Sequence, residues 1–418
     1  MSTVGIVVEY NPLHNGHLYH LQQSRKITGS DAVVAVMSGD FLQRGEPAMA
    51  SKWARAEMAL LAGCDLVLEL PVAYSAQPAQ WFAYGAVATL EATGVVDSLC
   101  FGSESGDIEA LDAVASLLAE EPASFSDELG ARLKQGLPYP TAFAEAAQSY
   151  LRDRGLSHLA FSLEQPNHTL GLHYLIALRK LGSRIVPYSV RREKSEYGQT
   201  DITDVRIASA TALRKVLFGD PGAGMIAGSL DELAPYVPET TLGVLRREID
   251  AGRAPLSWEH YARPLFHRLY GLDAAALGEF AEVTEGLEHR IRGALPELGE
   301  LSVGALLDAL KTKRYTRTKL QRTLLRILLG HGKELLAPDR LAAGVQYVRV
   351  LGFTDRGRKL LGRMRKSASV PVVDSAARGE WPYLALDARA SAMYALAYRD
   401  ASAADPLLDY KKPPIQVR

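Results

Sequence analysis

The stretch VGIVVEYNPLHNGHLYH, residues Val4–His20, decides the fold of the N-terminal half. It begins with a short apolar run, Gly5–Val8, which predicts a buried strand. Asn11 and Pro12 end this strand, and the residues after His17 favour a helix. A strand that leads through a short loop into a helix predicts an anion site, because backbone N–H groups and the helix dipole both favour negative charge there.

Two imidazoles lie three residues apart in this loop, in the order His14-Asn15-Gly16-His17. They add side-chain donors beside the same charge, and Gly16 lets the backbone approach a ligand closely. Together with Pro12 the pattern resembles the (H/T)xGH signature of the nucleotidyltransferase and class I aminoacyl-tRNA synthetase superfamily, whose histidines contact ATP phosphates. The alternative is two histidines in an ordinary polar loop.

Four further apolar runs alternate with helical patterns and predict an α/β fold with a doubly wound parallel sheet. The predicted strands are Asp31–Met37, Asp65–Leu70, Val95–Phe101 and Ile185–Val190, and the helices between them include Ser51–Ala62, Gln77–Thr93 and Asn167–Leu181. Ligands bind beyond the carboxyl ends of such strands. We therefore expect Asn11–His17, Ser38–Arg44 and Gly102–Glu104 to meet at one crevice.

The length of 418 residues suits two or three domains. We expect a nucleotidyltransferase-like catalytic domain over residues 1–228, with a helical insertion around 105–160, and a mainly α-helical domain over 229–418. The helical patterns of the second part are Thr240–Ala251, Trp258–Leu269, Ala274–Phe280, Glu285–Leu295, Val303–Lys311, Arg317–Leu329 and Asp387–Arg399.

The composition predicts a cytoplasmic protein with no membrane partner. Cys64 and Cys100 lie in apolar surroundings and are expected to be buried and reduced. Their spacing does not match a metal site, and no metal ligands are predicted. The N-terminus lacks the pattern of a signal peptide, and no stretch approaches the roughly 20 apolar residues that span a membrane.

Charge is spread unevenly along the chain. Residues 301–418 hold 22 lysines and arginines against 10 acidic residues, whereas the first 300 hold 25 against 38. This asymmetry predicts that the C-terminal part binds a polyanion. The alternative is that the two parts attract each other.

The basic residues gather in Lys311–Arg326, which contains seven of them, no acidic residue and one aromatic, Tyr315. Basic stripes beside aromatic rings suit an RNA backbone with a splayed base. A solvated helix face is the alternative. The predicted RNA contacts are Lys311, Lys313, Arg314, Arg317, Lys319, Arg322, Arg326 and, from a second basic cluster, Arg358.

A second motif, IASATALR at Ile207–Arg214, resembles the ISSTxIR segment that closes over the triphosphate in nucleotidyltransferases. In such a segment Ser209, Thr211 and Arg214 supply hydroxyl and guanidinium groups. Two superfamily motifs in the right order are stronger evidence than either one alone.

The whole chain resembles the bacterial tRNA(Met) cytidine acetate ligase family. The matching segments are Val4–His20, Ser38–Pro47, Asp65–Pro71, Phe101–Glu104, Pro166–Gly171, Ile207–Arg214 and Val350–Phe353. The resemblance implies acetylation of N4 of the wobble cytidine of elongator methionine tRNA, with ATP as co-substrate, Mg²⁺ beside it, and acetate as acyl donor. The ATP site that it implies comprises Val7, Val8, Glu9, Tyr10, Asn11, Pro12, Leu13, His14, Asn15, Gly16, His17, Leu18, Tyr19, His20, Gly102, Asn167 and Arg192.

Within this interpretation, His14, His17 and Asp40 are the predicted catalytic residues, and Asp40, Gln43 and Arg44 face acetate or cytidine. Each of several residues also has a structural alternative. Asp40 could be a helix cap or turn residue, Glu9 and Tyr10 could pack at the strand end, and Asn167 could cap its helix. Lys52 and Arg55 are expected on a solvated helix face.

Two segments depart from the family pattern: His168 replaces a common Asn, and Glu193–Asp201 lacks the usual Gly- and His-containing stretch. Two other functions stay open. One is an adenylyltransferase that makes a dinucleotide cofactor, although such chains are often near 200 residues and lack a basic helical half. The other is a non-catalytic tRNA-binding protein.

Overall fold

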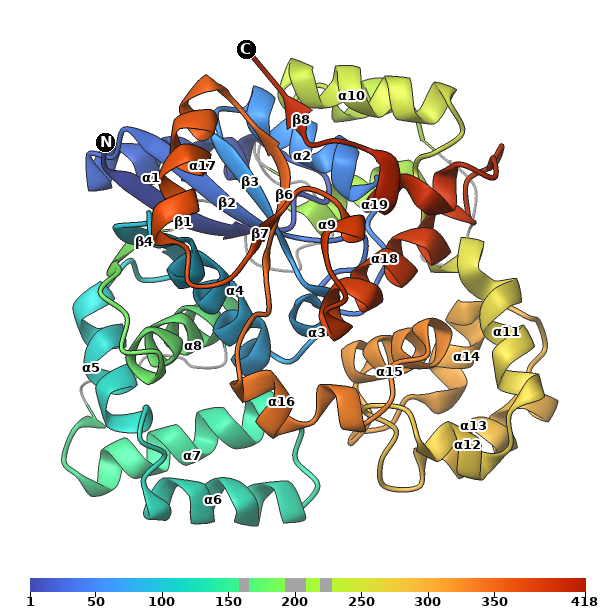
Figure 1. Ribbon diagram of the computed structural model, residues 1–418. Coiled ribbons are helices and arrows are strands. Elements are labelled where there is room, and N and C mark those ends of the chain that lie inside the picture. Colours follow the sequence, from blue (N-terminus) through green and yellow to red (C-terminus); the bar gives the residue numbers. More distant parts are fainter. Residues whose placement is uncertain (158–164, 192–207, 219–227) are drawn as a thin grey trace.

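The computed structural model describes residues 1–157, 165–191, 208–218 and 228–418. Eight strands of these residues form one sheet in the order β5-β4-β1-β2-β3-β6-β7, with β8 paired to β6 (Figure 1). The strands are β1 Thr3–Val8, β2 Ala32–Ser38, β3 Leu66–Leu70, β4 Ser98–Ser103, β5 Val186–Arg191, β6 Val348–Phe353, β7 Val372–Val373 and β8 Ile415–Gln416.

The five predicted strands are β1 to β5, and every pairing among them is parallel. This confirms the doubly wound α/β fold. Strand β1 pairs with β2 on one side and with β4 on the other, so the strand order reverses between β1 and β4. Such a reversal opens a ligand crevice at the carboxyl ends of the two strands.

Helices cover both faces of the sheet, as the apolar strands require. Along β2, Val33, Ala35 and Met37 join one core with residues of α1 and α2, whereas Ala32, Val34 and Val36 join the other with α4 and α8. These helices are α1 Asn15–Thr28, α2 Lys52–Leu61, α3 Val72–Ser75, α4 Ala79–Thr93 and α8 Pro166–Lys180. Ser51 caps α2 as predicted, accepting a hydrogen bond from the Ala54 N–H at 3.2 Å.

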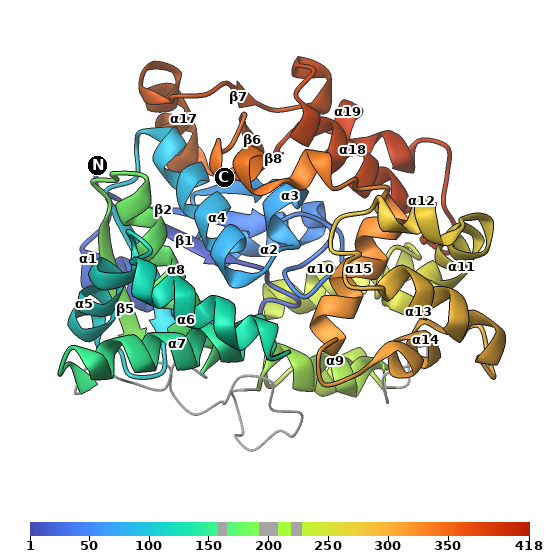
Figure 2. The same cartoon turned by 90° about the horizontal axis from the view of Figure 1, so that it is seen from below.

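The predicted insertion consists of α5 Ile108–Leu118, α6 Ala123–Lys134 and α7 Tyr139–Asp153. The remaining helices are α9 Ala210–Phe218, α10 Glu239–Asp250, α11 Ala262–Gly271, α12 Ala274–Gly278, α13 Leu287–Ala294, α14 Val303–Leu310, α15 Arg317–Leu329, α16 Pro338–Ala342, α17 Asp355–Ser367, α18 Pro382–Ala395 and α19 Leu408–Lys411. Seen from below, α6 and α7 lie on one side of the molecule and α11–α15 on the other (Figure 2).

The C-terminal half is mainly helical, but three strands that the sequence patterns did not predict return to the sheet. Strand β6 runs antiparallel to β3, and β7 and β8 pair with β6. Arg349 obscured β6 because a charged residue is unusual in a buried strand; its side chain is fully buried and its guanidinium bonds the Asp409 carbonyl at 3.0 Å. The division of the chain near residue 228 stays a prediction.

Cys64 and Cys100 are buried free thiols, as expected. Within the described residues, no helix is both long enough and apolar enough to cross a membrane.

Candidate active site

The His14–His17 pair forms the start of α1, directly beyond the end of β1. The His14 ring caps the helix, since its Nδ1 accepts from the Gly16 N–H at 3.1 Å, and the His17 Nδ1 accepts from the His14 N–H at 3.4 Å. The two rings stack with centroids 3.7 Å apart. A neutral imidazole that accepts a hydrogen bond at Nδ1 carries its proton on Nε2.

The chain makes a tight change of direction before this helix. Tyr10 has a φ of 51°, in the left-handed region that non-glycine residues rarely adopt. Its ring is 1% exposed and meets His17 edge-on at 5.1 Å between centroids. Conformations of this kind persist where the surrounding packing enforces them, often at functional sites.

The second motif forms an adjacent wall. Ser209 precedes α9, and its Oγ accepts from the Ala212 N–H at 3.0 Å. Arg214 donates to the Asn11 carbonyl at 2.9 Å and to the Glu46 carboxylate at 3.3 Å. The guanidinium therefore joins α9 to the loop after β1 and to the loop that carries Glu46.

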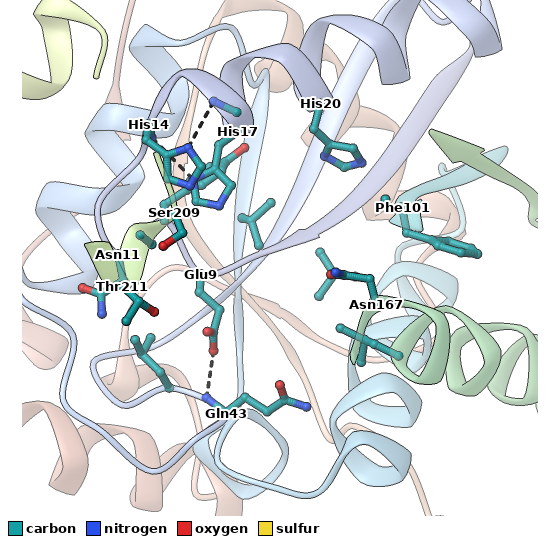
Figure 3. A pocket seen from close by; sticks show the side chains of 18 of the residues that line it. Glu9, Asn11, His14, His17, His20, Gln43, Phe101, Asn167, Ser209 and Thr211 are labelled. Carbon is teal, nitrogen blue, oxygen red and sulfur yellow. Dashed lines mark hydrogen bonds between the residues drawn. The ribbon is translucent and has the colours of Figure 1, made fainter. Parts of the chain in front are cut away.

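A third wall comes from the end of β4 and the start of α8. Glu104 accepts from the Asn167 N–H at 3.0 Å, the Asn167 side-chain amide at 2.8 Å and the His168 N–H at 2.7 Å. Glu104 thus caps α8, the task that the sequence alternative had given to Asn167. Asn167 itself lines the cavity, across from the α1 histidines (Figure 3).

These walls enclose a cavity of about 270 Å³ at the switch point of the sheet. The predicted residues that line it are Val7, Val8, Glu9, Tyr10, Asn11, His14, Gly16, His17, Tyr19, His20, Gln43, Arg44, Gly102, Asn167, Ser209, Thr211 and Arg214. Segments more than 200 residues apart in the sequence therefore meet at one place, as the strand topology predicts.

Comparison with known proteins accounts for this arrangement. A family model described as HIGH Nucleotidyl Transferase matches residues 1–406. The tRNA(Met) cytidine acetate ligase of Acetivibrio thermocellus is 41% identical over 374 residues, covering 89% of this chain and 88% of the relative. That of Thermoanaerobacter sp. (strain X514) is 36% identical over 422 residues, covering 100% of both chains. This chain belongs to the tRNA(Met) cytidine acetate ligase family.

Solved structures agree with that assignment. Apo Thermotoga maritima TmcAL has a TM-score of 0.91 and 36% identity to this chain, with 100% of both chains covered. A second crystal structure of the same protein, bound with alpha-thio ATP, has a TM-score of 0.89 and 35% identity over 100% of both chains. The fold predicted from the family resemblance is thereby confirmed over the full length.

Asp40 does not line the cavity in this member of the ligase family. It is 4% exposed, and its two oxygens accept from the Lys52 N–H at 2.7 Å and the Ser391 hydroxyl at 2.8 Å. Burial raises the pKa of Asp40, and the nearby Lys52 and Arg55 oppose that shift. The structure therefore contradicts the placement of Asp40 at the catalytic site. Asp40 is not the cap of α2 either, since that residue is Ser51; its carboxylate joins the first residue of α2 to Ser391.

Four other predicted residues of the ligase motif, Pro12, Leu13, Asn15 and Leu18, also lie off the cavity wall. They shape the loop: Asn15, for example, donates from its backbone N–H to the Tyr236 carbonyl at 2.8 Å. Arg192 and the departure Glu193–Asp201 lie outside the described residues; the preceding Arg191 lines the cavity.

The expected solvated face of α2 is wrong as well. Lys52 and Arg55 are both fully buried. The Lys52 ammonium bonds Glu69 at 2.7 Å and Asp409 at 2.8 Å. Arg55 donates to the carbonyls of Glu9 at 2.7 Å and Ser38 at 3.0 Å, and also to that of Gly39. These cations hold the strand ends in place from behind the cavity.

The predicted RNA-contact residues are exposed to very different degrees. Lys311, Lys313, Arg314 and Arg358 are exposed, and Arg317, Lys319 and Arg322 are partly exposed. Arg326 is fully buried and donates to the Val72 and Ala76 carbonyls and to His331. The prediction that Arg326 contacts RNA is wrong. Arg326 lies in the part of α15 that packs into the protein, so its side chain cannot reach an RNA backbone.

Helix α15, the basic helix that carries Arg317, Lys319 and Arg322, lies beside the cavity. Gly45 has a φ of +79°, and a Cβ there would lie 2.4 Å from the Arg322 backbone nitrogen. The loop at Gly45 therefore packs directly on α15, while its neighbours Gln43, Arg44 and Glu46 line the cavity.

The sequence patterns missed several lining residues: Leu42, Glu46, Phe82, Phe101, Leu170, Tyr174, Val190, Arg191 and Ala210. One signal was available for two of them. Leu170 and Tyr174 follow Asn167 at intervals of three and four residues, which places all three on one helix face.

Proposed function

We propose that this protein is an ATP-dependent ligase that activates acetate as acetyl-adenylate and acetylates N4 of the wobble cytidine of elongator tRNA(Met). One observation carries the proposal: the His14–His17 pair and Arg214 meet at the sheet's switch point, in a chain 41% identical to a ligase of that name. The alpha-thio ATP bound by the similar Thermotoga maritima TmcAL supports ATP as co-substrate.

In the first step an acetate oxygen attacks the α-phosphorus of ATP. A P–O bond forms to acetate as the bond to the bridging oxygen breaks, and pyrophosphate leaves with the electron pair. Such a displacement depends mainly on positioning and on stabilising charge. The Nε2–H groups of His14 and His17 and the N-terminus of α1 donate toward the phosphates, while Arg214 adds positive charge and holds the loop at Asn11.

ATP occupies the cavity against the predicted residues that line it, and Mg²⁺ accompanies the phosphates. The described residues include no group of three or more histidine, cysteine, aspartate or glutamate side chains placed to hold a metal. The ligands of Mg²⁺ in this proposal are mainly phosphate oxygens and water. Arg192 remains a predicted ATP contact.

Acetate and cytidine approach from the side of Gln43 and Arg44. Both line the cavity, and a guanidinium offers a planar pair of donors that suits a small carboxylate. In the second step the cytidine amine attacks the acetyl carbon and AMP leaves.

The tRNA lies along α15 and the basic residues before it, beginning at Lys311. The packing of Gly45 on α15 supports this, because it sets the basic helix beside the cavity that must receive the target base. Residues 1–228 form the catalytic domain and 229–418 the domain that carries most tRNA contacts. The activity belongs to the cytoplasm, where tRNA is found.

The decisive experiment supplies purified protein with ATP and acetate, with and without elongator tRNA(Met). We expect acetate-dependent exchange of pyrophosphate into ATP, and N4-acetylcytidine by nucleoside mass spectrometry only when tRNA is present. Consumption of a mononucleotide with unmodified tRNA would favour the dinucleotide-forming adenylyltransferase. Binding of tRNA without AMP release would favour a non-catalytic binding protein.

A further inference from the structure

The side chain of Glu9 extends from the end of β1 into the cavity, toward Gln43 (Figure 3). Its Oε1 accepts from the Gln43 N–H at 2.8 Å and from the Ser38 hydroxyl at 3.2 Å. Within the described part of the chain, Oε2 has no hydrogen-bond partner. One oxygen thus fixes the orientation of the carboxylate, and the other remains able to accept a proton.

The backbone behind this carboxylate is held rigidly. Arg55 is fully buried and donates to the Glu9 carbonyl at 2.7 Å while it also holds the end of β2. Among the described residues, the charged groups that act on the Glu9 carboxylate are Arg55 from α2 and Glu46 from the neighbouring loop. Burial raises the pKa of Glu9, and the Gln43 hydrogen bond opposes the shift.

Glu9 and Glu46 are the two carboxylates among the described residues that line the cavity. Glu46 already accepts from Arg214 at 3.3 Å. The third nearby acid, Glu104, is committed to the first turn of α8. The Nδ1 atoms of His14 and His17 already accept hydrogen bonds from the backbone.

We propose that Glu9 is a catalytic residue of the second step, where Oε2 accepts a hydrogen bond from the cytidine N4 amine and takes its proton. This rests on the proposed function. The C–N bond forms as N4 attacks the acetyl carbon, the C–O bond to the adenylate phosphate breaks, and AMP leaves with the electron pair. The proton lost from N4 moves to Oε2 and then to water.

The same contact selects the base. Glutamate accepts from the N4 amine of cytosine in nucleic-acid recognition. Uracil presents an oxygen at that position, so the Glu9 carboxylate would face a second acceptor. This repulsion excludes uridine from the position that cytidine occupies.

The test separates the two half-reactions in the Glu9→Gln variant. Because Glu9 also lines the cavity that holds ATP, acetate-dependent pyrophosphate exchange should fall, but by a much smaller factor than transfer. A melting temperature like that of wild type shows that the variant is folded. Single-turnover transfer to tRNA(Met) from preformed acetyl-adenylate should fall by about 10²–10⁴, the usual contribution of a general base. The wild-type transfer rate should rise with pH as Glu9 ionises, and this rise should be absent in Glu9→Gln.

Two further variants complete the test. Glu9→Asp retains a carboxylate and should keep the pH dependence at a reduced rate. Glu46→Gln removes the other cavity carboxylate and should change both half-reactions by the same factor. Equal loss of both steps in Glu9→Gln would assign Glu9 to acetate activation, and unchanged transfer would assign the proton to another group; either result overturns the proposal. If wild-type protein shows no acetate-dependent exchange, the proposed function itself is wrong.

Discussion

Charged and polar groups lie on two sides of the same strand ends: one side lines the cavity, and the other is buried behind it. On the cavity side, Glu9 lines an open space and keeps one oxygen without a partner among the described residues. Behind it, Asp40 uses both oxygens, and the Lys52 ammonium bonds Glu69 and Asp409 with every side chain almost fully buried. We call Lys52, Glu69, Arg349 and Asp409 the buried charge network.

The difference separates the groups that can bind a ligand from those that only stabilise the fold. A buried charge is costly unless it is paired with an opposite charge. In the buried charge network Lys52 pairs with Glu69 and Asp409, and Arg349 pairs with Asp409, so these groups stabilise the fold and do not face the cavity. The network joins α2 to β3 and to α19, near the end of the chain. It thereby holds in place the strand ends that lie behind the cavity. Changes behind the strand ends should therefore affect stability, and changes in the cavity should affect catalysis.

The largest effect is expected from Lys52→Met, which leaves Glu69 buried without its cation and Asp409 with Arg349 as its remaining cation. Breaking a buried pair in this way typically lowers the free energy of unfolding by about 3–5 kcal/mol. Urea denaturation of both proteins measures the change. Arg246→Met is the matched control, since its partner Asp231 is also acidic but both side chains are exposed, at 58% and 81%; its loss should be at most about 1 kcal/mol. Similar losses in the two variants would remove the distinction between the two sides.

The second-largest effect is expected on catalysis, from removal of the His17 ring. His17→Ala should reduce acetate-dependent pyrophosphate exchange by about 10²–10³, or roughly 3–4 kcal/mol, the usual result of removing one preorganised donor. Its melting temperature, measured beside the exchange rate, shows whether removal of the ring that stacks on His14 also lowers stability. His289→Ala, on a ring 76% exposed, should match wild type. Normal exchange in His17→Ala would refute the phosphate-contact role.

Much of the fold follows from the sequence because its signals are local. Five apolar runs predicted β1 to β5, and the strand-order rule then brought Gly102, Asn11 and Gln43 to one cavity. Strand β6 was missed because an arginine in the sequence predicts a surface position. Arg349 is buried because it bonds Asp409, which lies 60 residues later in the chain.

The same limit applies to the site. Motif matches located His14, His17, Ser209 and Arg214, but the position of a residue after a strand does not say which way its side chain points. Asp40 and Glu9 both follow strands, and only the packing of α18, which supplies Ser391, shows that Asp40 is enclosed. Long-range partners of this kind are not encoded in local spacing.

A histidine away from the candidate active site allows a finer test: His173 is buried in α8 and is not part of the cavity that His14 and His17 line. Burial lowers the pKa of His173 to about 4, with Lys180 adding to the shift. The unfolded chain takes up this proton near its ordinary value of about 6.5. Between these values the unfolded state binds more protons, so stability falls as pH falls, by at most about 1.4 kcal/mol per pH unit.

His173→Phe should remove that component, since the Nε2 atom has no partner among the described residues and the ring packs on Phe143. Urea unfolding at several pH values between 4 and 6.5 measures the slope for both proteins. His331 titrates in both and cancels in the comparison. An identical slope in wild type and His173→Phe would show that His173 stays equally protonated in both states.

The smallest effects, on tRNA binding, are expected from the basic residues in and before α15. This one segment contains both exposed and buried basic residues. Replacing Lys313 or Arg317 with Ala should each lower the salt dependence of tRNA binding, with the slope of log K against log salt falling by about 1 for each phosphate that the protein no longer neutralises. Arg317 now pairs with Asp308 at 2.9 Å, a surface pair weak enough to exchange for a phosphate.

Arg326→Met should instead lower stability and leave the slope unchanged, because its guanidinium already bonds the Val72 and Ala76 carbonyls inside the protein. Arg246→Ala, an exposed arginine of α10, is the control for removal of a surface charge. A slope that falls equally in Arg246→Ala would mean that tRNA responds to overall charge and not to this surface.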